Sequence, residues 1–517
     1  MNKTLILITL MTLWASGCGN DDNGDLQIQN QNPKDFSVEA TEITNNSTLL
    51  KWSPATDPEG DVVTYTIFLE QNEVQSQLQT TEFLLENLVE ETNYSGKVVA
   101  SDGKNGASES TFSFTTTETI NSEIAIAWQK SLGGTLDEEA YSIRQTNDLG
   151  YIVVGASESN NGDVGGNKGN KDCWVVKLDS QGVIQWETNI GGTNNETAHD
   201  VQQTNDGGYI IGAFSSSNDG NVAGNHGMRD FWIVKLNASG NISWKRNLGG
   251  SKDDILEAII ETSNGEFVAV GYTSSDSFNV KGQSDAWIVK LDESGTLLWE
   301  TNFGGSQRDL AFSVDETSDQ GCIVAGYTET TDNKRDMLVI KLDNEGKHEW
   351  NKTYTGSENE EAASIQQTND GGYIIGGYSK SSDGDIGKNN GANDALVIKT
   401  DNQGNIIWKK VLGGSKSDGV NDIKQTTDGG YIAAGSSTSD DLDVAENHGG
   451  ADFWILRLQA SGDLVWQQNL GGEGNDYAFS IEETKDGGFI TTGSWYTNIT
   501  GNGGGFGDFN YWVIKLE

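Results

Sequence analysis

Residues 178–186 read Leu178-Asp179-Ser180-Gln181-Gly182-Val183-Ile184-Gln185-Trp186, a tight turn that leads into a strand signal and a tryptophan. The turn and the tryptophan belong to a self-similar unit of about 57 residues, a period typical of repeat architectures. The tryptophan marks seven copies of the unit: Trp128, Trp186, Trp244, Trp299, Trp350, Trp408 and Trp466. Because the unit holds only strand signals, it cannot bury its own hydrophobic face and must stack on its neighbours.

The repeats predict an all-β fold, with a seven-bladed β-propeller over residues 124–517. In the first unit the predicted strands are 140–146, 151–157, 174–179 and 183–190. The repeat region begins with a lone outer strand, 124–132, and ends after a third strand, 511–517. We therefore expect the amino-terminal strand to complete the seventh blade, which closes the ring and hides the edges of an open sheet.

The second strand of a unit carries a residue with little or no side chain four positions after its first aromatic or equivalent residue. It is Ala213 in one copy and glycine in the other six: Gly155, Gly271, Gly326, Gly377, Gly435 and Gly493. Inner strands of a propeller crowd around the axis, so we expect the small residue to relieve that crowding.

Residues 33–117 carry a different pattern, with alternating runs at 48–52 and 63–69 that flank a turn-rich segment. These runs predict a β-sandwich. The segment resembles a fibronectin type III domain, in which Trp52 would be the core tryptophan. The run from Leu88 to Tyr94 is similar to the tyrosine corner of that family, which implies that the Tyr94 hydroxyl bonds back to the backbone. A spacer role is expected for this domain.

The first eighteen residues predict an export signal, with a short apolar stretch followed by Ala15-Ser16-Gly17-Cys18. Small residues before a cysteine resemble the lipobox of bacterial lipoproteins, which implies that Cys18 is acylated and anchors the chain to a membrane. The acidic stretch 19–32 is similar to the tethers of Gram-negative lipoproteins displayed on the outer face of the outer membrane. A chance cysteine and a plain linker are the alternatives. Residues 118–123 are expected to form a second linker.

The chain contains 77 acidic and 33 basic residues, a formal net charge of −44. Such a surface repels phosphate backbones and anionic headgroups, so nucleic acid is not expected as a partner. The cysteines other than Cys18 are Cys173 and Cys322. They occupy repeat positions filled elsewhere by packing residues, which predicts buried thiols without a redox role.

The turn and tryptophan of residues 178–186 are also similar to the docking motif of pyrroloquinoline-quinone-type propeller repeats. The spacing here is one residue shorter and the usual threonine is missing. We interpret the likeness as shared packing between blades. No quinone, haem or nucleotide is expected as a cofactor.

An acidic residue follows the glycine of the loop before each first strand by four positions, and the seven are Glu138, Glu196, Asp254, Asp309, Glu360, Asp418 and Asp476. One hypothesis is a ring of carboxylates around the mouth of a central channel, which would attract a cation or a polar ligand. The alternative is structural, with each carboxylate accepting backbone N–H groups of its own Gly-Gly turn. Aspartates at the start of third strands, such as Asp172 and Asp394, are interpreted as turn caps.

Long loops between second and third strands are rich in Asp, Asn and Gly, a composition that suits Ca²⁺. The candidate ligands are Asp383 and Asp385 in the fifth unit and Asp441 and Asp443 in the sixth. None of these loops has the full EF-hand pattern, so a loop without metal is the alternative.

Trp495 lies outside the two tryptophan positions of the repeat and replaces a serine or threonine of the other units. Tyr496 follows it, and Phe506 lies in a glycine-rich loop nearby. These three residues predict an aromatic platform for a sugar ring or a peptide. The alternative is a cluster that packs at the seam of the ring.

No Gly-x-Ser-x-Gly elbow and no His-Glu-x-x-His helix occurs in the sequence, and no catalytic residue is assigned. The sequence favours a lipid-anchored binding or adhesion protein at the cell surface of a Gram-negative bacterium, with an extracellular glycan or protein as ligand. The alternative is a carbohydrate-active enzyme, a polysaccharide lyase or glycoside hydrolase, because fold alone does not choose between the two.

Overall fold

The computed structural model describes residues 30–41, 43, 47–89, 92–116, 124–278, 280–496 and 509–517. Within these ranges the chain is all-β, with one turn of 3-10 helix, η1 (Asp276–Phe278), and no α-helix. None of the helical structure described there has the length and apolar character needed to cross a bilayer. The chain divides into two compact units, Met1–Ile120 and Asn121–Glu517. The proposed acylation site Cys18 lies outside the described residues, as do most of the predicted tether and the linker 118–123.

The first unit is a sandwich of two antiparallel sheets. One sheet holds β1 (Val38–Thr41), β2 (Thr48–Trp52) and β5 (Glu82–Leu85), and the other holds β3 (Thr64–Leu69), β4 (Asn72–Leu78), β6 (Asn93–Ser101) and β7 (Ala107–Thr115). Trp52 is buried between the sheets, with its ring centroid 5.4 Å from that of Tyr65. The backbone N–H of Val89 donates to the Tyr94 hydroxyl at 2.8 Å, so the predicted tyrosine corner is present.

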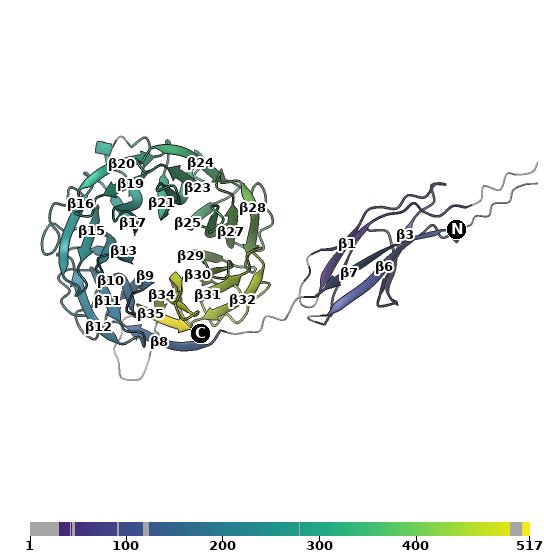
Figure 1. Cartoon of the computed structure of the whole chain (residues 1–517), viewed down its shortest axis with the longest axis horizontal. Helices are drawn as coiled ribbons and strands as arrows, with labels where there is room; N and C mark the ends of the chain where they lie inside the picture. The colour runs from purple at the N-terminus through teal and green to yellow at the C-terminus, as the bar shows by residue number, and fades with distance from the viewer. Residues whose placement is uncertain are drawn as a thin grey trace, which may run out of the picture. The chain divides into compact units, whose positions relative to one another are not determined.

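The second unit consists of seven four-stranded antiparallel sheets arranged around a common centre (Figure 1). The first strands, nearest the centre, are β9 (Glu138–Gln145), β13 (Glu196–Gln203), β17 (Asp254–Glu261), β21 (Asp309–Glu316), β25 (Glu360–Gln367), β29 (Asp418–Gln425) and β33 (Tyr477–Glu483). The second strands are β10 (Tyr151–Ser157), β14 (Tyr209–Ser215), β18 (Phe267–Thr273), β22 (Cys322–Glu329), β26 (Tyr373–Ser379), β30 (Tyr431–Ser437) and β34 (Phe489–Tyr496).

The third strands are β11 (Asp172–Leu178), β15 (Asp230–Leu236), β19 (Asp285–Leu291), β23 (Arg335–Leu342), β27 (Asp394–Thr400), β31 (Asp452–Leu458) and β35 (Phe509–Leu516). The outer strands are β12 (Ile184–Ile190), β16 (Ile242–Leu248), β20 (Leu297–Phe303), β24 (His348–Tyr354), β28 (Ile406–Leu412), β32 (Leu464–Leu470) and β8 (Ile126–Leu132). The strand β8 is the first of this unit in sequence, yet it pairs with β35, with Tyr511 opposite Leu132 and Lys515 opposite Trp128. The arrangement is propeller-like.

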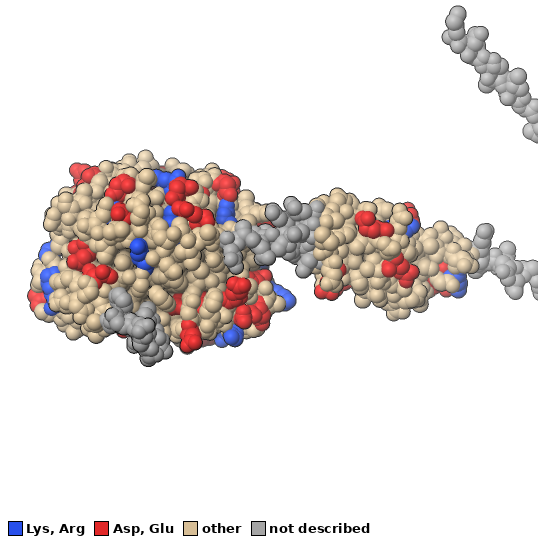
Figure 2. Space-filling view, turned by 90° about the horizontal axis from the view of Figure 1, so that it is seen from below, with Lys and Arg blue, Asp and Glu red and all other residues tan. Residues whose placement is uncertain are grey.

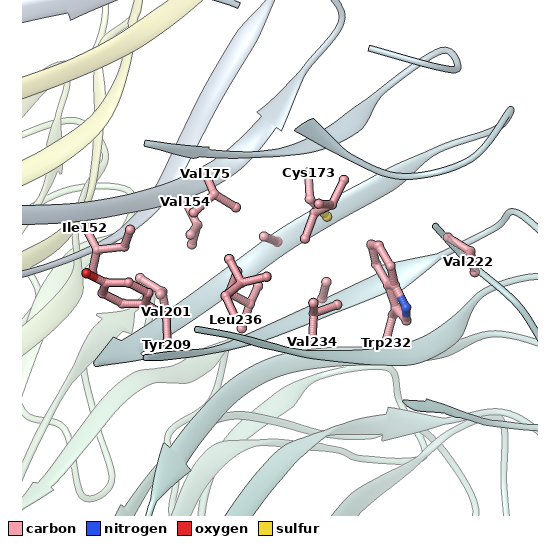
Figure 3. Packing of buried hydrophobic residues seen from close by; sticks show 14 residues of the cluster. Ile152, Val154, Cys173, Val175, Val201, Tyr209, Val222, Trp232, Val234 and Leu236 are labelled. Carbon is pink, nitrogen blue, oxygen red and sulfur yellow. The ribbon is translucent and has the colours of Figure 1, made fainter. Parts of the chain in front are cut away.

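The hydrophobic core lies between neighbouring sheets. In Figure 3, Ile152, Val154 and Val175 of the first sheet face Tyr209, Trp232 and other apolar side chains of the second. The marker tryptophan of one unit docks on the next: the rings of Trp186 and Tyr209 lie 5.7 Å apart. A Cβ on Gly240, in the turn between β15 and β16, would lie 3.0 Å from the Trp186 ring, and the φ of Gly240 is +79°. Only glycine suits both conditions, which explains the repeated turn.

Hydrogen bonds also join each sheet to the next. The side chain of the last residue of each inner strand accepts a backbone N–H of the turn that follows the preceding inner strand, at 2.7–2.9 Å. The seven acceptors are Gln145, Gln203, Glu261, Glu316, Gln367, Gln425 and Glu483. The bond from Lys485 N–H to Gln145 links the seventh sheet to the first.

Candidate ligand site in the central channel

The seven carboxylates that precede or begin the first strands do not ring the mouth of the channel. All seven are buried, and each accepts the backbone N–H of the residue four positions earlier, at 2.6–2.8 Å. The hypothesis of a carboxylate ring is therefore wrong, and the structural alternative holds. The sevenfold repetition reflects the need to satisfy the same buried turn in each unit.

The aspartates at the start of third strands cap turns, as expected. Asp394 accepts the backbone N–H of Asn390 at 2.5 Å through Oδ2, whereas its Oδ1 is buried without a hydrogen-bond partner. Gly413 separates Asp394 from Asp418 of the next unit, and a Cβ placed on this glycine would lie 2.8 Å from an oxygen of each carboxylate. Burial raises the pKa of Asp394, the bond from the Asn390 backbone lowers it, and the nearby Asp418 charge raises it again. The net result is a pKa of about 6.

The proposed calcium ligands each accept a backbone N–H of a nearby turn. Asp383 and Asp385 accept from Ser357 (2.8 Å) and Thr355 (3.1 Å). Asp441 and Asp443 accept from Ser415 (2.7 Å) and Gly413 (3.2 Å). In the first unit Asn161 occupies the position of Asp383, and its side-chain oxygen accepts the equivalent backbone N–H, that of Thr135. Across the described residues, no three His, Cys, Asp or Glu side chains are grouped so that they could hold a metal ion. Calcium binding by these loops stays a prediction.

Within the described residues, Trp495 and Tyr496 of the predicted aromatic platform contact different partners, and ligand binding by the platform stays a prediction. Trp495 is partly buried and stacks on Trp512, with ring centroids 5.2 Å apart, against the core between the sixth and seventh sheets. Tyr496 follows it in β34, where successive side chains point to opposite faces. Its ring instead meets Phe509 at 5.4 Å. Phe506 lies outside the described residues. In the third unit the loop residue Phe278 covers the equivalent Trp287, so the contact of Trp495 matches the packing alternative.

The described second unit is hollow at its centre, where the seven inner strands surround a channel. Two adjoining cavities, about 480 Å³ and about 350 Å³, are lined by side chains from all seven inner strands. These volumes fall in the range of small-molecule sites. Sequence reasoning assigned no residue inside the channel.

Seven residues shared by both cavities form a belt, and each occupies the same position of its inner strand: Tyr141, His199, Glu257, Phe312, Ala363, Asn421 and Phe479. Each belt residue is the extra residue of a β-bulge, because the pairing with the second strand skips it; in β9, for example, Ala140 and Ser142 are paired and Tyr141 is not. A bulge re-aims one side chain, and bulges are common beside functional sites.

The bulge also accounts for the small residue that the second strand carries in every unit, which the sequence analysis attributed to crowding at the axis. Gly155 lies opposite Ala140, and a Cβ on Gly155 would lie 1.9 Å from the carbonyl oxygen of Glu139. The same 1.9 Å approach recurs at the other five glycines. The carbonyl next to the bulge, rather than crowding at the axis, therefore limits the space for a side chain, and the methyl group of Ala213 is the largest side chain found at this position.

Polar contacts surround the aromatic side of the belt. The Tyr141 ring lies 5.2 Å from both Phe479 and His199, and its hydroxyl donates to Glu139 at 2.5 Å. His199 Nδ1 lies 2.8 Å from a Glu257 oxygen. Burial opposes protonation of His199, but the Glu257 carboxylate, the Leu256 backbone and the Asp200 charge together outweigh burial and raise the pKa of the imidazole. Burial, with the Glu139 charge, raises the pKa of Tyr141 well above its ordinary value.

Two ion pairs line the larger of the two cavities. Arg144 pairs with Asp200 at 3.3 Å, and Lys424 pairs with Asp422 at 2.8 Å. Asp200 also accepts the backbone N–H of Ile259, and Asp422 that of Ile481, both at 3.1 Å. These two carboxylates therefore join neighbouring sheets. Burial favours the neutral form of Asp422, but Lys424 and Arg144 hold its pKa below its ordinary value.

The sequence did contain a signal for the belt. Two positions after the belt residue each inner strand carries Ile or Val, and three positions before it each copy has Glu or Asp. At the belt itself the copies carry six different residue types. Alignment of the copies on the acidic residue isolates this variable position inside an otherwise regular strand.

Comparison with known proteins identifies the domain family of the first unit. Residues 31–117 match the model of the fibronectin type III domain. The regulatory protein FlaEY of Caulobacter vibrioides is 26% identical over 186 residues, which is 32% of this chain and 19% of that protein's length. The chain therefore spans only a small part of this relative.

Solved structures with a similar arrangement include a puromycin hydrolase mutant (TM-score 0.41, 10% identity, 78% of this chain and 57% of that one). A glucose dehydrogenase gives a TM-score of 0.35 at 6% identity, over 75% of this chain and 99% of that one. Scores this low support no inference about activity. What the comparisons establish is that residues 31–117 form a fibronectin type III domain.

Proposed function

We propose that this protein is a non-catalytic binding protein at the surface of a Gram-negative bacterium. In this proposal acylated Cys18 anchors the chain in the outer membrane and the fibronectin type III domain acts as a spacer. The seven sheets form a closed seven-bladed β-propeller, and its central channel receives part of an extracellular glycan or protein. Support for closure comes from the pairing of β8 with β35 and from the bond between Lys485 and Gln145.

The belt carries the proposal. Positions that serve the scaffold repeat in all seven units, because each unit meets the same packing and hydrogen-bonding needs. The seven bulge residues face one cavity and vary from tyrosine to alanine. A scaffold role does not explain such variation on a shared backbone geometry, whereas recognition of an asymmetric ligand does.

Catalysis is the weaker candidate. Two carboxylates that lie beside cations in the channel, Asp200 and Asp422, also bind backbone N–H groups of neighbouring strands. A catalytic acid or base must be free to exchange a proton with a substrate, and these two are held in the joints between sheets.

The test is a binding screen of the purified protein against glycan and peptide arrays, with a reducing-sugar assay on each glycan that binds. Tyr141→Ala and Phe479→Ala should each weaken binding about tenfold or more, as expected for a central aromatic contact. Their melting temperatures should change little, because Ala363 already occupies the equivalent bulge in the fifth unit. Leu298→Ala, on the exposed outer strand β20, is the matched control and should bind like the parent.

Unchanged binding by both belt variants would remove the channel from the proposed function. Release of reducing ends by the parent, lost in the same variants, would instead favour the carbohydrate-active enzyme.

A further inference from the structure

The charge on the channel walls restricts the ligand. Seven carboxylates line the two cavities: Asp200, Glu257, Asp315, Glu361, Asp422, Glu482 and Glu483. The permanent cations in the same lining are Arg144 and Lys424. A concave site with low-dielectric walls concentrates the field of its charges, so this channel attracts cations and repels anions. The outer surface shown in Figure 2 also carries many Asp and Glu side chains, in keeping with the net charge of −44.

Most of these carboxylates are engaged in the scaffold, but Glu257 differs. Asp315 accepts the backbone N–H of Gln367, Glu482 that of Gln145, and Glu483 that of Thr427, each at 2.7–2.8 Å. Glu361 pairs with Arg335. Glu257 sits on a bulge in the belt, and its ion-pair partner is His199. Glu257 raises the pKa of His199, so the imidazolium is favoured in the absence of a ligand. Unlike Lys or Arg, an imidazolium can release its proton when a second cation approaches Glu257, so this carboxylate has no permanent counter-charge.

Aromatic rings provide the second, independent feature. Tyr141, Phe312 and Phe479 lie at the same level of the channel as Glu257 and line both cavities with it. Aromatic rings attract cations through their quadrupole, and rings combined with a carboxylate are a recurring means of holding an organic ammonium group. Hydrated metal ions gain little from such rings, so the combination favours an organic cation.

We propose that the belt binds a protonated primary amine of the ligand between the aromatic rings and Glu257. This inference rests on the proposed binding role of the channel and specifies its ligand chemistry. The amine can come from a lysine side chain of a protein or from an amino sugar of a glycan. The shared feature is a compact ammonium group on a neutral, partly apolar body.

The test uses four probes in two matched pairs, measured by isothermal titration calorimetry on the purified full chain. Nα-acetyl-lysine amide is compared with its neutral Nε-acetylated form, and glucosamine with N-acetylglucosamine. At least one charged probe should bind, with its neutral counterpart about tenfold weaker or more, and added NaCl should weaken the binding. The charged probe that binds with the higher affinity identifies the source of the amine: the lysine derivative indicates a protein, and glucosamine indicates a glycan.

Two variants locate the site. Glu257→Gln should weaken the charged probe about tenfold or more. Phe312→Leu keeps an apolar side chain of similar size but removes the ring, and should also weaken it. Glu345→Gln makes the same charge change in the outer hairpin between β23 and β24 and should have no effect. Melting curves of all three variants establish that they are folded.

The amine assignment is overturned if neutral and charged probes bind equally, or if Glu257→Gln binds like the parent. It is also overturned if none of the four probes binds while an array ligand still depends on Tyr141 and Phe479, and in that case the proposed binding role stands. If array binding is unaffected by the belt variants, the channel role itself fails.

Discussion

Replacement of Asp394 by asparagine should stabilise the protein. Asp394 is fully buried, its Oδ1 has no hydrogen-bond partner, and the carboxylate of Asp418 lies across Gly413. Its pKa is raised from 3.8 to about 6. A rise of about two units at about 1.36 kcal/mol each means that ionised Asp394 costs on the order of 3 kcal/mol at neutral pH. Asparagine can keep the oxygen that accepts the Asn390 N–H and offer an N–H₂ group to Asp418 in place of the orphan oxygen.

The protein itself provides a precedent for this change. In the seventh unit the equivalent residue is Asn510, which lies across Gly133 from Glu138. We therefore expect Asp394→Asn to raise the free energy of unfolding by about 1 to 3 kcal/mol at pH 8, or the melting temperature by a few degrees.

The pH dependence gives this prediction its sharpest test. Because the pKa of Asp394 is higher in the folded state, the native protein takes up the proton first as the pH falls. The parent thus regains stability between pH 6 and about pH 4, and the advantage of the variant should disappear over that range. Differential scanning calorimetry of both proteins from pH 4 to pH 8 measures it.

Asp401→Asn is the matched control in the same unit. Asp401 is partly exposed. The Asn405 side chain and the backbone N–H groups of Asn405 and Gln403 donate to its carboxylate and lower its pKa. Asparagine there removes the same charge without relieving a buried pair, so no gain is expected. An equal gain in both variants, or a gain at Asp394 that persists at pH 4, would refute the reasoning and point to the overall charge of the chain.

Three further changes test the packing and the anchor. Trp408→Ala should lower the free energy of unfolding by about 3 kcal/mol in denaturant titrations, because the ring packs on Tyr431 of the next sheet and its N–H donates to the Ala460 carbonyl. A loss below about 1 kcal/mol would mean that docking of this tryptophan contributes little to stability. Trp495→Ala should cost about 2 to 4 kcal/mol with normal ligand binding by the folded fraction, whereas weakened binding at unchanged stability would restore the aromatic platform. Cys18→Ser should shift the protein from the membrane fraction to the soluble fraction on immunoblots, and full retention in membranes would contradict acylation.

Local pattern was enough to predict features that each unit builds for itself. The docking tryptophan, the turn glycine and the carboxylate that caps the Gly-Gly turn repeat because every unit faces the same neighbour under the same geometry. The tyrosine corner of the first domain is likewise a local motif, since Val89 and Tyr94 are five residues apart and meet within one corner. In each of these cases the residues in contact lie within one unit, or at equivalent positions in two consecutive units.

The tertiary structure decided what depends on several units at once. Tyr141, Glu257 and Phe479 lie far apart in sequence and share a cavity only because seven bulges point to one axis. Trp495 and Tyr496 are neighbours in sequence, but alternation along β34 sends them to different partners. Asp394 and Asp418 belong to different sheets, and their repulsion exists only where two units meet. Sequence therefore determined the repeated scaffold, because its contacts are local and periodic. The candidate site instead arises from one side chain per unit, and these side chains meet only because the seven sheets are arranged around a common centre.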